Sequence, residues 1–307
     1  MAMETGQSTA DIAEELNDSV WEFCAPNGIP EEEIIFFHGL QVDNFEQAFW
    51  KTWVAKNDDK LVWPKEWLSK KFEKARILSV TYNSSASQSS GHSTSDMYRL
   101  GENLVTDIIL DAECDIGQKC PVVLIGHCLG GIVIKQFIMS AFNMMFKMDN
   151  ELDKRKIKRI RTFLNNFKGA FFYATPHGGS EEITRFAQQL DNASPVLELL
   201  KTLSTETARI NEEFRMHRKN LKARTYGIGE SLPTTTSGFN AVIVTEASAR
   251  HDLDGYYTYQ KADHFAVCKA TTMRDATVIG KLNQFINETL EDTLAITQNQ
   301  PVEMELT

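Results

Sequence analysis

The sequence predicts an α/β fold in which helices cover both faces of a mostly parallel sheet. Short apolar runs rich in Val, Ile and Phe alternate with longer amphipathic segments along the 307 residues, as expected for strands joined by crossover helices. The hydrophobic fraction of 42% is enough for a core of ordinary size. The predicted strands are 19–25, 33–39, 75–82, 121–126, 169–175, 222–229 and 240–246, and the predicted helices are about 96–113, 129–147, 181–190, 203–219 and 272–295.

These elements predict one domain at 18–295, between a polar N-terminal segment, 1–17, and a polar tail or linker, 296–307. The stretch 177–221 is longer than a simple crossover needs, so it predicts a helical insertion that forms a cap over a site. The stretch 83–95 has seven serines in thirteen residues and no apolar period, which predicts a flexible loop.

Composition and charge argue against several classes of function. A net charge of −10 disfavours nucleic acid as a partner, because a phosphate backbone needs a cationic surface. The five cysteines are an odd number without a CxxC pair or a metal-ligand spacing, which favours a reducing compartment and argues against zinc. No signal peptide and no apolar run near the roughly 20 residues of a membrane span are visible. We therefore expect a cytoplasmic protein without a cofactor.

The stretch VVLIGHCLGGIVIK, residues 122–135, predicts a sharp turn between a buried strand and a helix. Gly126 and Gly130 flank Cys128 in the frame G-x-C-x-G, which is the nucleophile elbow G-x-S-x-G with cysteine in the central position. Glycines on both sides remove Cβ atoms that would collide in so tight a turn. The helix that begins at Leu129 directs its free N–H groups at the same point, so we expect a reactive thiol of lowered pKa.

Three histidines follow predicted strands at the same edge of the sheet. His264, in KADHFAVCK, lies where a general base belongs when the chain order is nucleophile, acid, base. His38, in IIFFHGL, is predicted to be a hydrogen-bonded support, and the loop after it offers the Leu40 N–H, which would form an oxyanion hole together with the Leu129 N–H. His177, in YATPHGGS, is predicted to shape the pocket.

Two carboxylates compete for the third position of a catalytic triad. Glu230 follows the predicted strand 222–229, where the acid is expected, and is the preferred candidate. Glu246, at the end of NAVIVTE, is the alternative. Asp252, Asp254 and Asp263 fit less well, and Asp263 adjoins the base in sequence and would point away from it.

Six motifs in the order FFHGL, GHCLGG, YATPHGGS, GESLPT, VTEASA and ADHFAVCK resemble those of α/β-hydrolases related to the GPI inositol-deacylases and to serine-active-site lipase-like proteins. The resemblance covers almost the whole predicted domain. It implies the α/β-hydrolase fold and hydrolysis of an ester or thioester, with an acyl ester or lipid-like small molecule as substrate. It also implies a set of site residues: Cys128 as nucleophile, His264 as base, Glu230 as acid, and the amides of Leu40 and Leu129 as oxyanion donors.

Similar domains stand at the N-terminus of NLR-type immune receptors of fungi, mosses and liverworts. The resemblance therefore implies an alternative role in innate immunity or plant defense, in which the domain signals by self-association or partner binding with weak or no catalysis. The chain departs from the family's pattern at Gln41, where a glycine is usual after H-G-L, and at Glu246, which stands one residue earlier than in many relatives.

Three interpretations fit a cysteine at the elbow. A native thiol beside an imidazole would be a competent nucleophile. A native but nearly inert thiol would leave a binding or signalling module. An engineered Ser-to-Cys change would trap an acyl intermediate or silence a serine hydrolase.

The block KRKIKRIR, residues 154–161, has six Lys or Arg among eight residues of an acidic chain. Such charge runs are usually a solvated helix end. The alternative is a contact surface, which would bind anionic lipid headgroups at a membrane surface or an acidic face of a second copy.

Overall fold

The computed structural model describes residues 9–41, 46–86, 97–148, 151–190, 192–236 and 239–299. Its centre is an eight-stranded sheet with the strand order β1-β2-β6-β3-β7-β8-β9-β12. At one edge β1 (Glu14–Asn17) pairs antiparallel with β2 (Val20–Cys24), which pairs antiparallel with β6. The other six strands are mutually parallel: β6 (Ala75–Val80), β3 (Glu32–Phe37), β7 (Val122–His127), β8 (Phe167–Tyr173), β9 (Arg224–Glu230) and β12 (Gly255–Tyr259).

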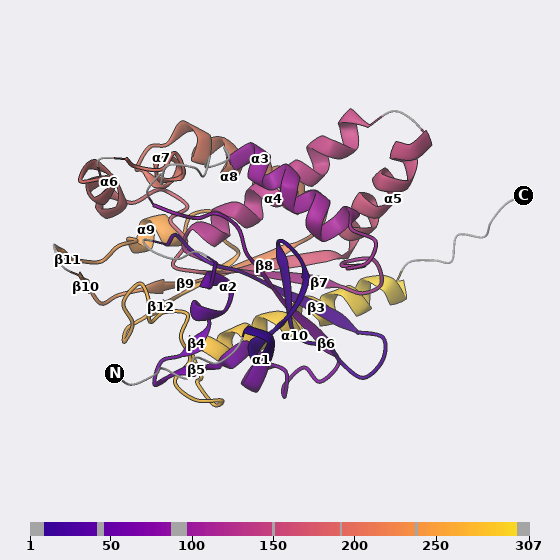
Figure 1. Cartoon of the computed structure of the whole chain (residues 1–307), viewed down its shortest axis with the longest axis horizontal. Coiled ribbons are helices and arrows are strands. Elements are labelled where there is room, and N and C mark those ends of the chain that lie inside the picture. The colour runs from indigo at the N-terminus through magenta and orange to yellow at the C-terminus, as the bar shows by residue number, and fades with distance from the viewer. Residues whose placement is uncertain are drawn as a thin grey trace, which may run out of the picture.

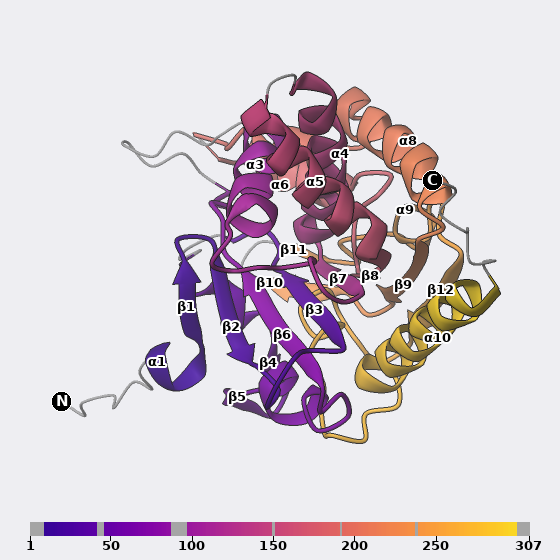
Figure 2. The same ribbon diagram turned by 90° about the vertical axis from the view of Figure 1, so that its right-hand side faces the viewer.

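Helices cover both faces of this sheet, as the sequence predicts. One face carries α3 (Met97–Leu104), its π-helical continuation η2 (Val105–Leu110), α4 (Leu129–Lys147), α5 (Glu151–Asn166) and α8 (Thr205–Asn220). The other face carries α10 (Val278–Asn299), as Figure 2 shows. Successive side chains of a strand point to opposite faces, so the buried apolar residues divide into two clusters, one on each side of the sheet.

The smaller elements lie around this framework. The predicted insertion 177–221 is helical and consists of α6 (Glu181–Gln188), α7 (Val196–Leu200) and α8. The N-terminal third adds α1 (Thr9–Ile12), α2 (Ala48–Lys51), the hairpin of β4 (Val54–Ala55) and β5 (Asp58–Val62), and the π-helical turn η1 (Pro64–Leu68). Most of the serine-rich stretch, 87–95, lies outside the described residues.

The central helix of the first face is α4, which begins directly after Cys128. Its residues 129–141 are all buried, and it packs against α3, α5 and α8. Within the described ranges α4 is the helix that is long and apolar enough to cross a membrane, and 72% of its apolar window is buried inside the fold. Its apolar character is therefore explained by its place in the core.

The predicted strand 240–246 is wrong. The start of this stretch belongs to β11 (Phe239–Ala241), which pairs with β10 (Thr234–Thr236) in a separate hairpin. Its end begins the short helix α9 (Glu246–Ala249), which Thr245 caps. The last strand of the sheet is β12 instead, which the sequence analysis does not assign. As an edge strand β12 is only half-buried, so its sequence GYYTY lacks the continuous apolar run of an inner strand.

Two helices also differ from the prediction. No helix is predicted at α5, because its many Lys and Arg residues hide an amphipathic pattern. In the structure Ile160, Phe163 and Leu164 are buried at helical spacing. The last helix begins at Val278 rather than at 272, because the Asp275 carboxylate accepts hydrogen bonds from the backbone N–H groups of residues 277 and 278. This helix continues to Asn299, into the predicted tail. At the other end of the chain, the last residues of the predicted N-terminal segment form β1 and belong to the sheet.

We predict that Gly130→Ala strongly destabilises the fold. A Cβ atom at this position would lie 2.2 Å from the carbonyl oxygen of Phe37, and only a shift of the backbone relieves such a contact. We expect a loss of about 3 kcal/mol in the free energy of unfolding, measured by urea denaturation.

Gly280→Ala in α10 is the matched control. The nearest atom to its added Cβ is 3.4 Å away, and alanine gains about 1 kcal/mol of helix propensity over glycine. Equal stability of the two variants would contradict the close approach of β3 to the start of α4.

Candidate active site

Cys128 occupies the sharp turn that the sequence predicts between β7 and α4. Its backbone has φ 51° and ψ −122°, a conformation that costs a non-glycine residue about 1–3 kcal/mol. The Cys128 N–H donates to the carbonyl of Tyr173 at 2.9 Å, and the Gly131 N–H donates to the Cys128 carbonyl at 3.2 Å. These bonds hold the strained residue at the carboxyl end of the central strands.

Glycines allow three chain segments to meet around Cys128. An added Cβ at Gly126 would lie 2.7 Å from the nitrogen of Gly131, and one at Gly131 would lie 2.2 Å from Oγ1 of Thr175. An added Cβ at Gly39 would lie 2.9 Å from the Cβ of Cys128. The loops after β3 and β8 thus pack directly against the turn.

His264 and Glu230 form a buried pair beside this turn. The Nδ1 atom of His264 lies 2.6 Å from Oε2 of Glu230, and the two residues are 4% and 2% exposed. The other carboxylate oxygen of Glu230 accepts the backbone N–H groups of Ile243 at 2.6 Å and Val244 at 3.0 Å. These charge-assisted bonds satisfy a carboxylate that has lost its water shell.

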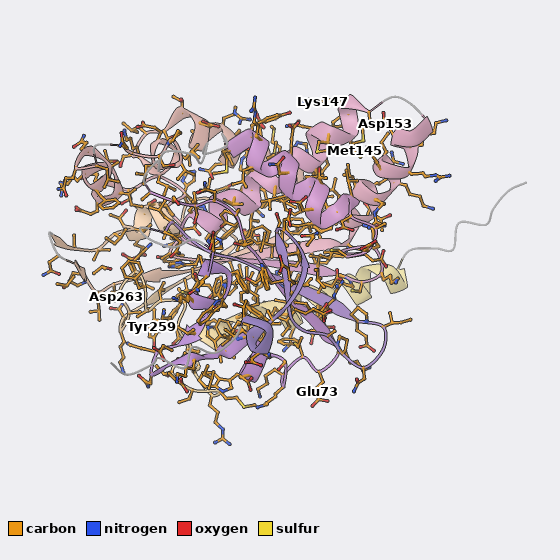
Figure 3. The ribbon with its side chains drawn as sticks, in the orientation of Figure 1. Glu73, Met145, Lys147, Asp153, Tyr259 and Asp263 are labelled. Carbon is orange, nitrogen blue, oxygen red and sulfur yellow. The ribbon has the colours of Figure 1, made fainter. Side chains whose placement is uncertain are left out.

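The structure pairs His264 with Glu230 and keeps the alternative, Glu246, away from it. Glu246 is the first residue of α9, its side chain is 56% exposed, and it contacts Arg250 and Thr258. Asp263 lies near the margin of the domain in Figure 3, and its carboxylate accepts backbone N–H groups of its own turn.

The charge state of His264 depends on its two partners. Burial lowers the pKa of this imidazole, but the charges of Cys128 and Glu230, together with hydrogen bonds to both, outweigh burial and raise its pKa to about 10. The imidazole lies between a sulfur atom and a carboxylate, as a nucleophile–base–acid array requires.

The two predicted oxyanion donors, the N–H groups of Leu40 and Leu129, lie on the segments that surround Cys128. Leu129 is the first residue of α4, so its N–H has no acceptor within the helix. No described residue offers an acceptor to the Leu40 N–H. The neighbouring Gly39 approaches Cys128 so closely that an added Cβ there would lie 2.9 Å from the Cys128 Cβ. Both N–H groups are thus available near the thiol, which is the arrangement an oxyanion hole needs.

His38 stabilises the loop after β3 that carries Leu40. It is fully buried, its ring stacks on Tyr82 with centroids 4.2 Å apart, and the Tyr82 hydroxyl donates to the His38 carbonyl. Gln41, the departure from the family's glycine, pairs through its backbone with Ser84 and Ala86. Gln41 therefore anchors the loop to the segment after β6.

Two further side chains, which the sequence does not single out, hold His264 in place. The Nε2 atom of His127 donates to the His264 carbonyl at 2.9 Å, and burial together with the nearby charge of His264 lowers the pKa of His127 to about 3. Thr234 accepts the His264 N–H at 3.0 Å. His127 directly precedes Cys128 in the sequence, and this position was the signal that could have pointed to its contact with His264.

His177 is not part of the group formed by Cys128, His264 and Glu230. It is 1% exposed and lies in the wall of a separate cavity beside α8. In the described part of the chain no three His, Cys, Asp or Glu side chains gather as a metal site would need.

Comparison with known proteins identifies the fold. No protein-family model matches the chain. The protein SERAC1 is 25% identical over 286 residues in Danio rerio, covering 87% of this chain, and 26% identical over 285 residues in Homo sapiens, covering 85%. The chain spans only about 40% of the length of these relatives.

Two solved structures share the architecture. The mature lipase BlEst2 of Bacillus licheniformis superposes with a TM-score of 0.54 at 13% identity, over 88% of this chain and 97% of the lipase. A phosphonate-inhibited esterase B of Lactobacillus rhamnosis gives a TM-score of 0.50 at 11% identity, over 92% and 83% of the two chains. The chain therefore has the α/β-hydrolase fold found in lipases and esterases, as the six motifs imply.

We predict that iodoacetamide labels Cys128 before the other cysteines at pH 7.5. Burial raises the pKa of Cys24 to about 11 and those of Cys114, Cys120 and Cys268 to about 12. Cys128 instead lies beside the His264 imidazole, which can accept the thiol proton as alkylation proceeds. Peptide mass spectrometry after timed alkylation measures the order.

Cys24 controls for accessibility, because it is the partly exposed cysteine whereas Cys128 is only 3% exposed. His264→Ala should slow the labelling of Cys128 and leave Cys24 unchanged. Labelling in order of exposure, with Cys24 first, would contradict an activated thiol.

Proposed function

We propose that this domain hydrolyses carboxylic esters or thioesters with Cys128 as nucleophile, His264 as acid and base, and Glu230 as the residue that orients His264. The observation that carries the proposal is the buried 2.6 Å contact between His264 and Glu230 next to a cysteine in a strained turn. A structural ion pair would not require such a turn, whose backbone cost has to be offset by packing elsewhere.

The first half of the reaction would transfer the acyl group to sulfur. The Cys128 thiolate attacks the carbonyl carbon, and the N–H groups of Leu40 and Leu129 stabilise the negative charge that develops on the carbonyl oxygen. When the C–O or C–S bond of the substrate breaks, the protonated His264 gives its proton to the leaving alkoxide or thiolate. Acyl-cysteine and an alcohol or thiol are the products of this half.

The second half would return the enzyme to its starting state. Neutral His264 now accepts a proton from water, and the resulting hydroxide adds to the thioester carbonyl. Collapse of this intermediate releases the carboxylic acid and the Cys128 thiolate beside the imidazolium. The pair of Glu230 with Nδ1 keeps Nε2 directed at the reacting atoms in both halves.

The likeness to a lipase and an esterase favours an acyl ester or lipid-like molecule as the substrate class. The proposal concerns the described domain, since the SERAC1 proteins are more than twice as long. An NLR-type signalling role gains no specific support from the geometry, whereas the ordered triad supports catalysis.

We also propose that the outer face of α5 binds an anionic surface. Arg155, Lys158 and Arg161 are exposed there, and the nearby Phe146, at the end of α4, is 77% exposed. Arg159 is excluded from this face because it donates to backbone carbonyls of η2 and the turn after it. The ends of α4 and α5 project together from the body of the domain at the upper right of Figure 1. Cations beside an exposed aromatic ring suit an anionic lipid surface.

We predict that Cys128→Ser keeps or raises the hydrolysis of short-chain p-nitrophenyl esters, because the fold's relatives are built around a serine nucleophile. His264→Ala in either background should lower kcat/KM by about a thousandfold or more, since nucleophile and base act as a unit. Retained turnover without His264 would refute the triad.

Glu230→Gln and Glu246→Gln form a matched pair of substitutions for the acid. Glu230→Gln should reduce kcat by about a hundredfold or more, because the amide can no longer stabilise the imidazolium. Glu246→Gln should leave kcat within about twofold, because its side chain lies at the surface. A larger loss for Glu246→Gln would reverse the assignment.

We predict that the domain binds vesicles of phosphatidylserine and phosphatidylcholine at low salt. Replacing Arg155, Lys158 and Arg161 by Glu should abolish co-sedimentation, since each cation contributes about 1 kcal/mol. Replacing the exposed lysines Lys56, Lys60 and Lys70 by Glu gives the same charge change elsewhere and should have a smaller effect. If wild-type protein binds no vesicles at low salt, the face serves only solubility.

A further inference from the structure

The side chain of His38 forms a hydrogen bond to the backbone of the loop that carries Leu40. Its Nδ1 atom lies 3.0 Å from the carbonyl oxygen of Gly39. A carbonyl oxygen only accepts hydrogen bonds, so Nδ1 has to carry the proton of the ring. Burial lowers the pKa of His38 to about 4, so at pH 7 the ring is neutral and has this one N–H. The contact therefore defines the tautomer of His38.

No other polar contact of the ring explains why this residue is a histidine. The Nε2 atom is buried and, within the described residues, has no hydrogen-bond partner. The Ser84 hydroxyl lies 3.5 Å from Nδ1, which is too far for a second strong bond. The ring also stacks on Tyr82, but a phenyl ring would stack there without leaving a buried nitrogen unpaired. What the imidazole adds is the bond from Nδ1 to Gly39.

This bond fixes the direction of a peptide group beside the nucleophile. The Gly39 carbonyl and the Leu40 N–H belong to one planar trans peptide, in which the C=O and N–H bonds point in opposite directions. Because the carbonyl is bonded to the His38 ring, the Leu40 N–H points away from that ring. It meets no acceptor among the described residues. An added Cβ at Gly39 would lie 2.9 Å from the Cys128 Cβ, so this free N–H is next to the residue that carries the thiol.

Gln41 supplies a second donor to the same carbonyl. Its Nε2 atom lies 3.4 Å from the carbonyl oxygen of Gly39. The backbone of Gln41 is fixed as well, since its N–H donates to Ser84 at 3.0 Å and its carbonyl accepts the N–H of Ala86 at 2.8 Å. A glycine, which the resembled hydrolases usually have at this position, would offer no side-chain donor.

Without these two bonds the peptide would be free to turn over. Glycine has few steric restrictions on its backbone, so the peptide between Gly39 and Leu40 could rotate until its carbonyl faced Cys128. A developing oxyanion would then meet oxygen lone pairs instead of an N–H and would not be stabilised.

We propose that His38 is a positioning residue of the esterase site, whose Nδ1–H, assisted by the side-chain amide of Gln41, holds the Leu40 N–H in the direction of the substrate's carbonyl oxygen. This inference rests on the proposed hydrolysis of esters or thioesters. His38 acts through the peptide and not on the substrate itself. Because the oxyanion forms only in the transition state, the contribution of His38 belongs to kcat rather than to KM.

Steady-state hydrolysis of p-nitrophenyl butyrate by variants of the whole chain tests the proposal. His38→Asn places an amide N–H where Nδ1 lies, whereas His38→Gln places one near Nε2. His38→Phe and His38→Gln should lower kcat at least about tenfold with KM within about twofold, as the loss of one oxyanion donor predicts. His38→Asn should keep kcat within about threefold of wild type. Gln41→Met should cause a smaller loss than His38→Phe, because its bond to Gly39 is longer.

His217→Phe is the matched control for His38→Phe. His217 also stacks on an aromatic ring, that of Phe142, with centroids 3.9 Å apart. It belongs to α8, and Phe142 lies in the half of α4 that is remote from Cys128. This variant should leave kcat and KM unchanged.

Alkylation provides a readout that a general disturbance of the fold would also change. Attack of Cys128 on iodoacetamide displaces iodide from a saturated carbon and forms no oxyanion. The variants of His38 should therefore alkylate at Cys128 within about twofold of the wild-type rate, although their hydrolysis is slower. In 15N-labelled wild-type protein at pH 7, the Nδ1 atom of His38 should give the resonance of a protonated nitrogen and Nε2 that of a bare one.

Three outcomes overturn the proposal. The first is a His38 ring protonated at Nε2. The second is a wild-type chain that hydrolyses the ester while His38→Phe matches it in kcat, which would refute the role of His38 and leave the proposed function intact. The third is an equal slowing of alkylation and hydrolysis in His38→Phe and His38→Asn, which would make the residue purely structural. A wild-type chain that hydrolyses no ester would instead refute the proposed function, and this inference with it.

Discussion

The close approach of backbone segments at Cys128 is the constraint on which the rest of this structure depends. A positive φ at a non-glycine residue is retained only where its surroundings fix it. Here Tyr173 accepts its N–H, and the positions 39, 126, 130 and 131 have no Cβ atoms. Any side chain at these glycines would push β3, β8 and α4 apart. The same packing that strains the turn therefore brings the loop after β3 close to the Cys128 side chain.

The buried Glu230 shows how the fold keeps a charge next to an apolar core. Removing a carboxylate from water costs several kcal/mol unless hydrogen bonds replace the lost solvent. Two backbone amides bind one oxygen and His264 binds the other. The amides belong to Ile243 and Val244, in the segment before α9, so that segment positions the Glu230 carboxylate. Glu246, the first residue of α9, lies at the surface instead.

Helix α4 connects the turn at Cys128 to the packing beneath α8. Its N-terminus carries the elbow, and two turns later Lys135 projects from the same helix into the layer beneath α8. The loop after β8 packs against both places. An added Cβ at Gly131 would lie 2.2 Å from Oγ1 of Thr175, and the carbonyl of His177 accepts a hydrogen bond from Nδ2 of Asn211.

The sequence by itself determined the inner strands and the elbow, and it pointed to Cys128 and His264, with Glu230 and Glu246 as competing acids. These features have local causes: continuous apolar runs for strands buried on both faces, and glycines where only glycine fits. It did not determine β12 or α5, because an edge strand and a basic surface helix bury too little to leave a clear pattern. Only the tertiary structure shows that His264 pairs with Glu230 while Glu246 lies at the surface. Such choices depend on which residues distant in the chain become neighbours, and hydrophobic periodicity contains no information about that.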